Sequence, residues 1–160
     1  MNDYDDNRGV HDHPRSTARI ATHPIHPMLV PFPIVCFIGV FVVDLLYMRG
    51  DTGVATASNW LLGIGLATAA LAALAGLTDF FGDQRVRGLG DAVKHMTANV
   101  IAVLIEAANL FLRLDNPDFI GSTGVYLSGL VVLILLYSGW KGGELVYRHG
   151  VGVLDRDHAH

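Results

Sequence analysis

The segment FIGSTGVYLSGLVVLILLYSGW, residues 119–140, runs for 22 positions without a charged side chain. A helix needs about 20 apolar residues to cross a hydrocarbon layer about 30 Å thick, because it rises about 1.5 Å per residue. Three other segments are of similar length and almost as apolar. The predicted spans are residues 28–48, 60–81, 95–113 and 122–147. The sequence therefore predicts an all-α membrane protein, a four-transmembrane-helix bundle.

The composition supports this class of protein. Of the 160 residues, 51% are hydrophobic and 16% are charged, and the mean hydropathy is +0.40. A water-soluble four-helix bundle would need a polar outer face, which none of the four segments offers. Residues 23–153 are predicted to form the transmembrane domain. Residues 1–22, which lack the pattern of a cleavable signal, are predicted to be a disordered N-terminal tail, and residues 154–160 a C-terminal tail.

The distribution of positive charge predicts the orientation in the membrane. An even number of spans puts both termini on one side, here called side A, and the opposite side is side B. Nine of the 11 Lys and Arg residues fall on side A, whereas Arg49 and Arg113 fall on side B. Because Lys and Arg are enriched in cytosolic loops, side A and both termini are predicted to be cytosolic.

The same topology gathers polar residues that are distant in sequence on side A. They are His26, Asp79, His95, Glu144 and His149. Asp79 is expected beside His95, where a carboxylate fixes the tautomer of an imidazole. Glu144 has an alternative partner in Arg148, four residues further along the same helix. Cys36 is the only cysteine, which excludes an internal disulfide and a thiolate zinc site.

Prolines at positions 24, 27, 31 and 33 mark the start of the first span. Proline lacks a backbone donor and pushes the preceding residue toward an extended conformation, so regular helix is predicted to begin near Pro33. His23 is expected to face lipid headgroups. For His26, a headgroup contact and a place inside the bundle are both open.

A polar stripe follows the third span at helical spacing. Its residues are His95, Asn99, Ala102, Glu106, Asn109 and Arg113. Steps of three and four residues put them on one helix face, which is predicted to turn inward because polar groups are costly in hydrocarbon. Asn99 and Asn109 are expected to hydrogen-bond between helices. Glu106 and Asp44 lie at similar depths toward side B, and we hypothesise that they share a proton.

Several of these motifs together resemble one bacterial family. They are HPIHPMLVPFPI (residues 23–34), GLTDF (76–80), the pair His95 and Asn99, and GGELVYRHGVGV (142–153). The chain resembles the family called domain of unknown function 2231, which implies a four-span protein of the bacterial inner membrane without an established activity. Relatives fused to Rieske or c-type cytochrome domains, and a likeness to small b-type cytochrome bundles, imply haem-linked electron transfer. This chain has Pro31 where many relatives carry a further histidine.

Two classes of function remain open. In the first, side A binds b-type haem or a divalent metal (Fe, Zn or Mn) for electron transfer. Two of His26, His95 and His149 would be the imidazole ligands, with Asp79 or Glu144 as metal ligands or acceptors. In the second, no cofactor binds and the chain is a non-enzymatic membrane scaffold or partner subunit whose polar residues only specify bundle packing. Histidines that point inward at one depth favour the first class. A proton or ion path along the Glu106 stripe is a weaker third option, because four short spans leave little room for alternating access.

Other activities are excluded by missing motifs. The sequence has no GxxxxGK[ST], GxGxxG, HExxH or GxSxG motif, so no stand-alone enzyme is expected beyond a redox subunit. A net charge of -4 with scattered basic residues argues against a nucleic-acid partner. The expected partners are the lipid bilayer, a redox partner protein and further copies of the chain in a homo-oligomer.

Overall fold

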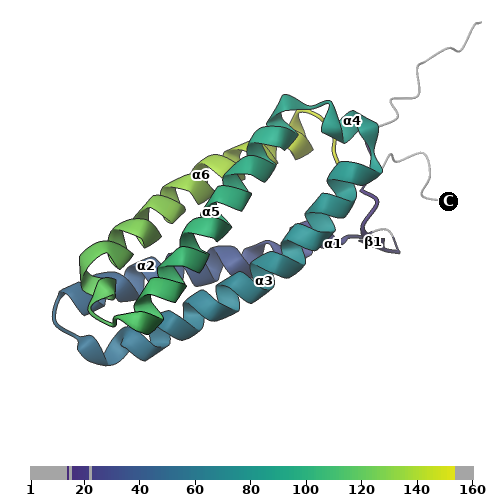
Figure 1. The fold of residues 1–160 in the computed structure, drawn as a ribbon. Coiled ribbons are helices and arrows are strands. Elements are labelled where there is room, and N and C mark those ends of the chain that lie inside the picture. The colour runs from purple at the N-terminus through teal and green to yellow at the C-terminus, as the bar shows by residue number, and fades with distance from the viewer. Residues whose placement is uncertain (1–13, 15, 22, 154–160) are drawn as a thin grey trace, which may run out of the picture.

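The computed structural model of the chain describes residues 14, 16–21 and 23–153. Four long helices run antiparallel in an elongated bundle (Figure 1). They are α2 (Pro31–Met48), α3 (Ala55–Gly82), α5 (Gly90–Asp115) and α6 (Val125–Tyr147). Within the described residues, four helical segments are long and apolar enough to cross a membrane. This confirms the predicted fold class.

The first span begins earlier than its prolines suggest. A two-residue strand, β1 (Arg19–Ile20), pairs antiparallel with β2 (His23–Pro24), and the short helix α1 (Ile25–Leu29) follows directly. The long helix α2 begins at Pro31, close to the predicted start near Pro33, and the short helix α1 that precedes it was not predicted. The prolines fall in the first turns of α1 and α2, where the backbone N–H groups have no partner within the helix and their loss costs little.

Short elements connect the long helices. A 3-10 turn, η1 (Thr52–Val54), precedes α3, and α4 (Gln84–Arg87) links α3 to α5. A π-helical turn, η2 (Ile120–Gly124), opens α6. The part of the predicted N-terminal tail at residues 16–21 instead forms β1 and its flanks. The rest of that tail and the predicted C-terminal tail, residues 1–13, 15, 22 and 154–160, lie outside the described residues.

The four long helices are arranged as two hairpins. Helix α2 packs against α3 and α6, and α5 packs against α6 and α3, so α2 and α5 face each other across the diagonal of the bundle. Both described chain ends lie at the end of the bundle that carries α4, which is side A (Figure 1). There the Gly152 amide donates to the Pro14 carbonyl, with an N–O distance of 3.0 Å.

The bundle has a buried core and an apolar exterior. The core residues are Phe37, Val40, Leu62, Ala69, Ala102 and Val131. Large apolar side chains cover the outside and are more than half exposed, among them Leu74, Phe111 and Leu136. Exposed aromatic residues lie near both ends: Trp60 and Tyr126 toward side B, and Trp140 and Tyr147 toward side A. An apolar band between two aromatic belts is the surface that a membrane-spanning bundle requires.

Candidate functional site

Two histidines meet at the side A end of the bundle. His26 lies in α1 and His95 near the start of α5. Their ring centroids are 6.1 Å apart and the ring planes are almost perpendicular, at 89°. Both side chains are partly buried. Two of the three predicted imidazole ligands therefore lie together, where the two hairpins meet.

The His26 ring is seated on helix α3. Its Nδ1 atom lies 2.8 Å from the carbonyl oxygen of Ala72. Because a carbonyl can only accept, Nδ1 carries the proton and Nε2 carries the lone pair. Gly76, one turn further along α3, leaves room for the ring, since a Cβ atom at this position would lie 2.9 Å from His26 Nδ1. Among the described residues, no hydrogen bond to His26 Nε2 is found.

The His95 ring has an equivalent seat on helix α6. Its Nδ1 atom lies 2.9 Å from the Ser138 carbonyl oxygen and 3.0 Å from Ser138 Oγ. Gly142, again one turn further along, makes room, since a Cβ atom there would lie 3.2 Å from His95 Cε1. Asn99 Nδ2 lies 3.1 Å from His95 Nε2 and donates to it, and it also donates to the His95 carbonyl at 2.9 Å. Both rings thus have the same tautomer.

Asp79 serves a different purpose from the one predicted. Its Oδ1 atom accepts hydrogen bonds from Ser16 Oγ at 2.8 Å, from the Ala18 amide at 2.7 Å and from Thr17 Oγ1 at 3.3 Å. Thr17 Oγ1 also donates to the Thr78 carbonyl at 2.8 Å. The carboxylate therefore ties residues 16–18 across the end of α3 instead of orienting His95.

His149 and Glu144 belong to a separate ionic cluster at side A. Asp91 lies in the first turn of α5. Its Oδ2 atom is 3.1 Å from His149 Nε2, and its Oδ1 atom is 3.1 Å from Lys141 Nζ. Lys141 also pairs with Glu144, whose other oxygen is 3.9 Å from Arg148. The cluster joins the start of α5 to the end of α6. No three His, Cys, Asp or Glu side chains come together as a metal-binding group anywhere in the described part of the chain.

A second polar centre lies in the side B half of the bundle and is completely buried. Arg113 Nη1 donates to Asp44 Oδ1 at 2.9 Å and Arg113 Nη2 to Asp44 Oδ2 at 2.5 Å. Ser58 Oγ and Ser128 Oγ each donate to one Asp44 oxygen at 2.6 Å. The Arg113 residue is 1% exposed and the other three are 0% exposed. This fork-shaped ion pair connects the diagonal helices α2 and α5, and the serines connect it to α3 and α6.

The network continues along α5 to Glu106. Asn109 Oδ1 accepts from Arg113 Nε at 2.8 Å, and Asn109 Nδ2 donates to Glu106 Oε2 at 2.9 Å. Glu106 and Asn109 are both 0% exposed, so the polar stripe faces inward as predicted. Asp44 is bound by Arg113 and the serines, and Glu106 connects to it through Asn109 and Arg113. The shared proton stays a hypothesis.

The spacing in sequence between the histidine and the buried charged residue is the same in the two hairpins. Asp44 follows His26 by 18 residues, and Arg113 follows His95 by the same 18 residues. The carbonyl and glycine that seat each histidine are also one helical turn apart in both hairpins. Helices α2 and α5 are diagonal partners, so the two hairpins carry these residues in corresponding places. His26 meets His95 at side A, and Asp44 meets Arg113 toward side B.

Sequence reasoning overlooks several of these residues. The sequence predicts Arg113 only as a side B cation on the polar stripe and does not predict its partner. It predicts no role for Ser58, Ser128 or Ser138. The equal spacing from each histidine to Asp44 and Arg113 was the available signal. The serines carried none, because small hydroxyl residues within apolar spans are common.

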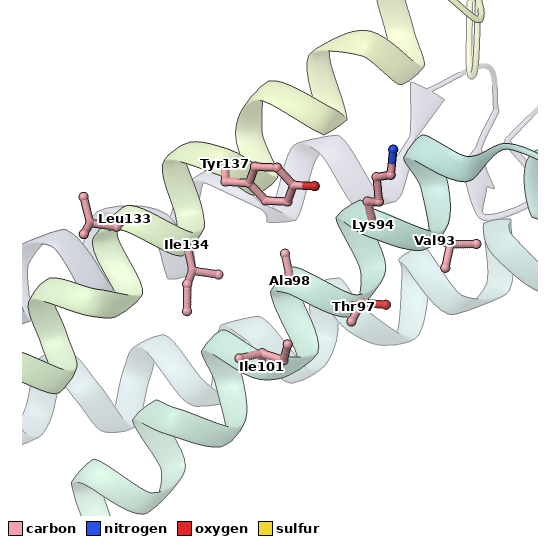
Figure 2. A pocket seen from close by; sticks show the side chains of 8 residues that line it. All are labelled: Val93, Lys94, Thr97, Ala98, Ile101, Leu133, Ile134 and Tyr137. Carbon is pink, nitrogen blue, oxygen red and sulfur yellow. The ribbon is translucent and has the colours of Figure 1, made fainter.

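A shallow groove of about 490 Å³ runs along the outer surface between α5 and α6 (Figure 2). Ile101, Leu133 and Ile134 form its apolar part, and Lys94 and Tyr137 lie toward side A. None of the predicted ligands lines it. Its position on the outside of the bundle makes it part of the lipid-facing surface.

Comparison with known proteins gives one result. A family model described as predicted membrane protein (DUF2231) matches residues 22–155, which is most of the chain. No curated protein and no solved structure matches the chain significantly.

Proposed function

This chain belongs to the DUF2231 family of membrane proteins, and we propose that it holds b-type haem or a redox metal ion between His26 and His95 as an electron-transfer subunit. One observation carries this proposal. Two imidazoles of the same tautomer, one from each hairpin, lie edge to face at the side A end with their centroids 6.1 Å apart.

The separation of the two rings supports a shared ion. Two imidazoles that bind one ion through metal–nitrogen bonds of about 2 Å have ring centres about 6 Å apart. Both Nδ1 atoms donate to backbone carbonyls, which is the usual way in which ligating histidines are oriented with Nε2 toward the metal. At His95 an ion would take the place of the Asn99 amide, whose Nδ2 keeps its bond to the His95 carbonyl.

The donor set favours haem over zinc or manganese. A structural zinc site takes four protein ligands, whereas haem iron takes two axial ligands because the porphyrin supplies the other four. His26 and His95 supply two, and the described residues offer no third His, Cys, Asp or Glu to make a metal-binding group. Bound haem would supply one-electron transfer. The contribution of the chain is to fix both rings through Ala72 and Ser138.

A scaffold function is the second candidate, and the remaining side A residues favour it. Asp79 fastens the N-terminal segment, while Asp91, Glu144 and His149 join helix ends. All four side chains have structural partners. If no cofactor binds, the contact between His26 and His95 is edge-to-face packing of two rings. It is then one more contact that holds the side A end of the bundle together.

The orientation and location of this site also belong to the proposal. The excess of Lys and Arg on side A supports a location of the histidine pair at the cytosolic face of a bacterial inner membrane. A redox partner protein would then approach from the cytosol, at the end of the bundle formed by α1 and the start of α5.

Optical spectra and metal analysis of the purified protein test the proposal. We expect a Soret band that shifts on reduction and is lost in both His26→Ala and His95→Ala. His149→Ala is the matched control and should keep the band, because His149 pairs with Asp91 outside the pair. If the folded wild-type protein shows neither a Soret band nor bound metal, cofactor binding is contradicted and the scaffold function is favoured.

Alanine substitutions at two neighbouring glycines of α6 test whether the contact with this helix orients the His95 ring. We expect Gly142→Ala to lower cofactor occupancy, because its Cβ atom would lie 3.2 Å from His95 Cε1 and push the ring from its position. Gly143→Ala should leave occupancy unchanged, since nothing lies within 4 Å of a Cβ atom at this position. Occupancy is read as the Soret absorbance per protein at equal helical content. Equal occupancy in the two variants would contradict the role of the seat.

A further inference from the structure

We infer that Glu106 is a proton-binding site inside the membrane, occupied by a proton in the folded protein at neutral pH. The side chain is 0% exposed. Its Oε2 atom accepts a hydrogen bond from Asn109 Nδ2 at 2.9 Å. Its Oε1 atom is buried and has no hydrogen-bond partner among the described residues. Oε2 is thus bonded as an acceptor oxygen, and Oε1 receives no hydrogen bond that would stabilise a negative charge on the carboxyl group.

The charges of the surrounding network leave Glu106 without a cation. Arg113 is the only cation in it, and its three guanidinium nitrogens are engaged: Nη1 and Nη2 with Asp44, and Nε with Asn109 Oδ1. Asp44 and Arg113 therefore neutralise each other. An ionised Glu106 would add a net negative charge in a fully buried position. Burial of an uncompensated carboxylate is so costly that the group takes up a proton instead.

Each of the four long helices contributes a group to the buried network that includes Glu106. Helix α2 supplies Asp44, α3 supplies Ser58 and α6 supplies Ser128. Of these groups only Asp44 is charged, and its negative charge opposes the ionisation of Glu106. On α5, the positive charge of Arg113 favours the ionised form, but Arg113 connects to Glu106 only through Asn109 and is already paired with Asp44.

The orientation of Asn109 follows from the same bonds. Its Oδ1 atom accepts from Arg113 Nε, so its Nδ2 atom must face Glu106 and donate. Asn109 therefore offers Glu106 a donor and no acceptor. This arrangement holds Oε2 as the carbonyl oxygen and leaves the proton on Oε1. Glu106 lies about 14 Å along α5 from the side B end at Asp115, at a rise of about 1.5 Å per residue.

Infrared spectroscopy with labelled glutamate tests this inference independently of any cofactor. The sequence contains only two glutamates, Glu106 and Glu144. Glutamate labelled with 13C at the side-chain carboxyl carbon, incorporated into the protein in lipid vesicles, therefore labels only these two carboxyl groups. We expect a labelled C=O band of a protonated carboxyl at neutral pH, which shifts in D2O. Glu144→Gln should keep the band, because Glu144 pairs with Lys141, and Glu106→Gln should remove it.

The wild-type spectrum decides the matter even if Glu106→Gln fails to fold. A labelled spectrum at neutral pH that contains only carboxylate bands would overturn the inference. The same holds for a protonated band that disappears in Glu144→Gln. If a sodium or potassium ion compensates Glu106 instead, the labelled group gives a carboxylate band that responds to exchange of the salt, which also overturns it.

Discussion

Arg113→Met is expected to lower the free energy of unfolding by about 3–5 kcal/mol, because it leaves a buried carboxylate without its cation. The Arg113 guanidinium binds both oxygens of Asp44 and also bonds to Ser58, Ser128 and Asn109. Methionine fills much of the same space and removes all five donors. Chemical unfolding in detergent micelles, repeated in bicelles, measures the loss.

Two further variants separate the ion pair from general damage. Arg49 lies on the same side of the bundle and is exposed, so Arg49→Met should change the free energy of unfolding by less than about 0.5 kcal/mol. Adding Asp44→Asn to Arg113→Met should recover much of the loss, because no unpaired charge remains. Arg113→Lys should be intermediate, since an ammonium cannot bind both carboxylate oxygens as a planar fork. If Arg113→Met is as stable as Arg49→Met, the pair does not hold the hairpins together.

The sequence alone was sufficient to predict the four membrane spans and the face of α5 that points into the bundle. Hydropathy is a property of consecutive residues, and four apolar runs each had the length of a membrane span. The polar stripe needed only the helical period, which puts Glu106, Asn109 and Arg113 on one face whatever the neighbouring helices do. The burial of these three side chains confirms that step.

The partners of the polar residues depend on the register between helices, and the sequence does not give this register. Asp79 was expected beside His95, but residues 16–18 cross the end of α3 and their backbone and hydroxyl groups reach it first. His149 was grouped with the other histidines. Instead the chain beyond α6 turns it toward Asp91, at the start of α5. Neither contact leaves a periodic pattern.

The glycines of α3 are a second case in which the sequence does not give the contacts between helices. Small residues indicate that a helix packs closely on its neighbours. Gly63 and Gly65 are only two positions apart, so they lie on different faces, and composition does not tell which of them meets another helix. A Cβ atom at Gly65 would lie 2.6 Å from Phe37 Cε1 on α2, whereas one at Gly63 would meet nothing within 4 Å.

Gly65→Ala is therefore expected to lower the free energy of unfolding by about 1–3 kcal/mol, because the added methyl group overpacks the contact between α2 and α3. Phe37 is 2% exposed and belongs to the buried core, so moving its ring aside disturbs neighbouring core side chains. Gly63→Ala is the matched control on the same helix. It should be neutral or stabilising by up to about 1 kcal/mol, since alanine favours helix over glycine. Both values come from unfolding curves in the same detergent.

A compensating variant identifies the clash itself. Phe37→Leu removes the ring atoms nearest to Gly65 and creates space, so on its own it should destabilise the protein. Combined with Gly65→Ala it should cost less than the sum of the two single changes, because the new methyl group occupies part of that space. Additive losses would mean that Gly65 matters through some property other than its contact with Phe37. Equal stability of Gly65→Ala and Gly63→Ala would contradict close packing of α2 on α3 at this position.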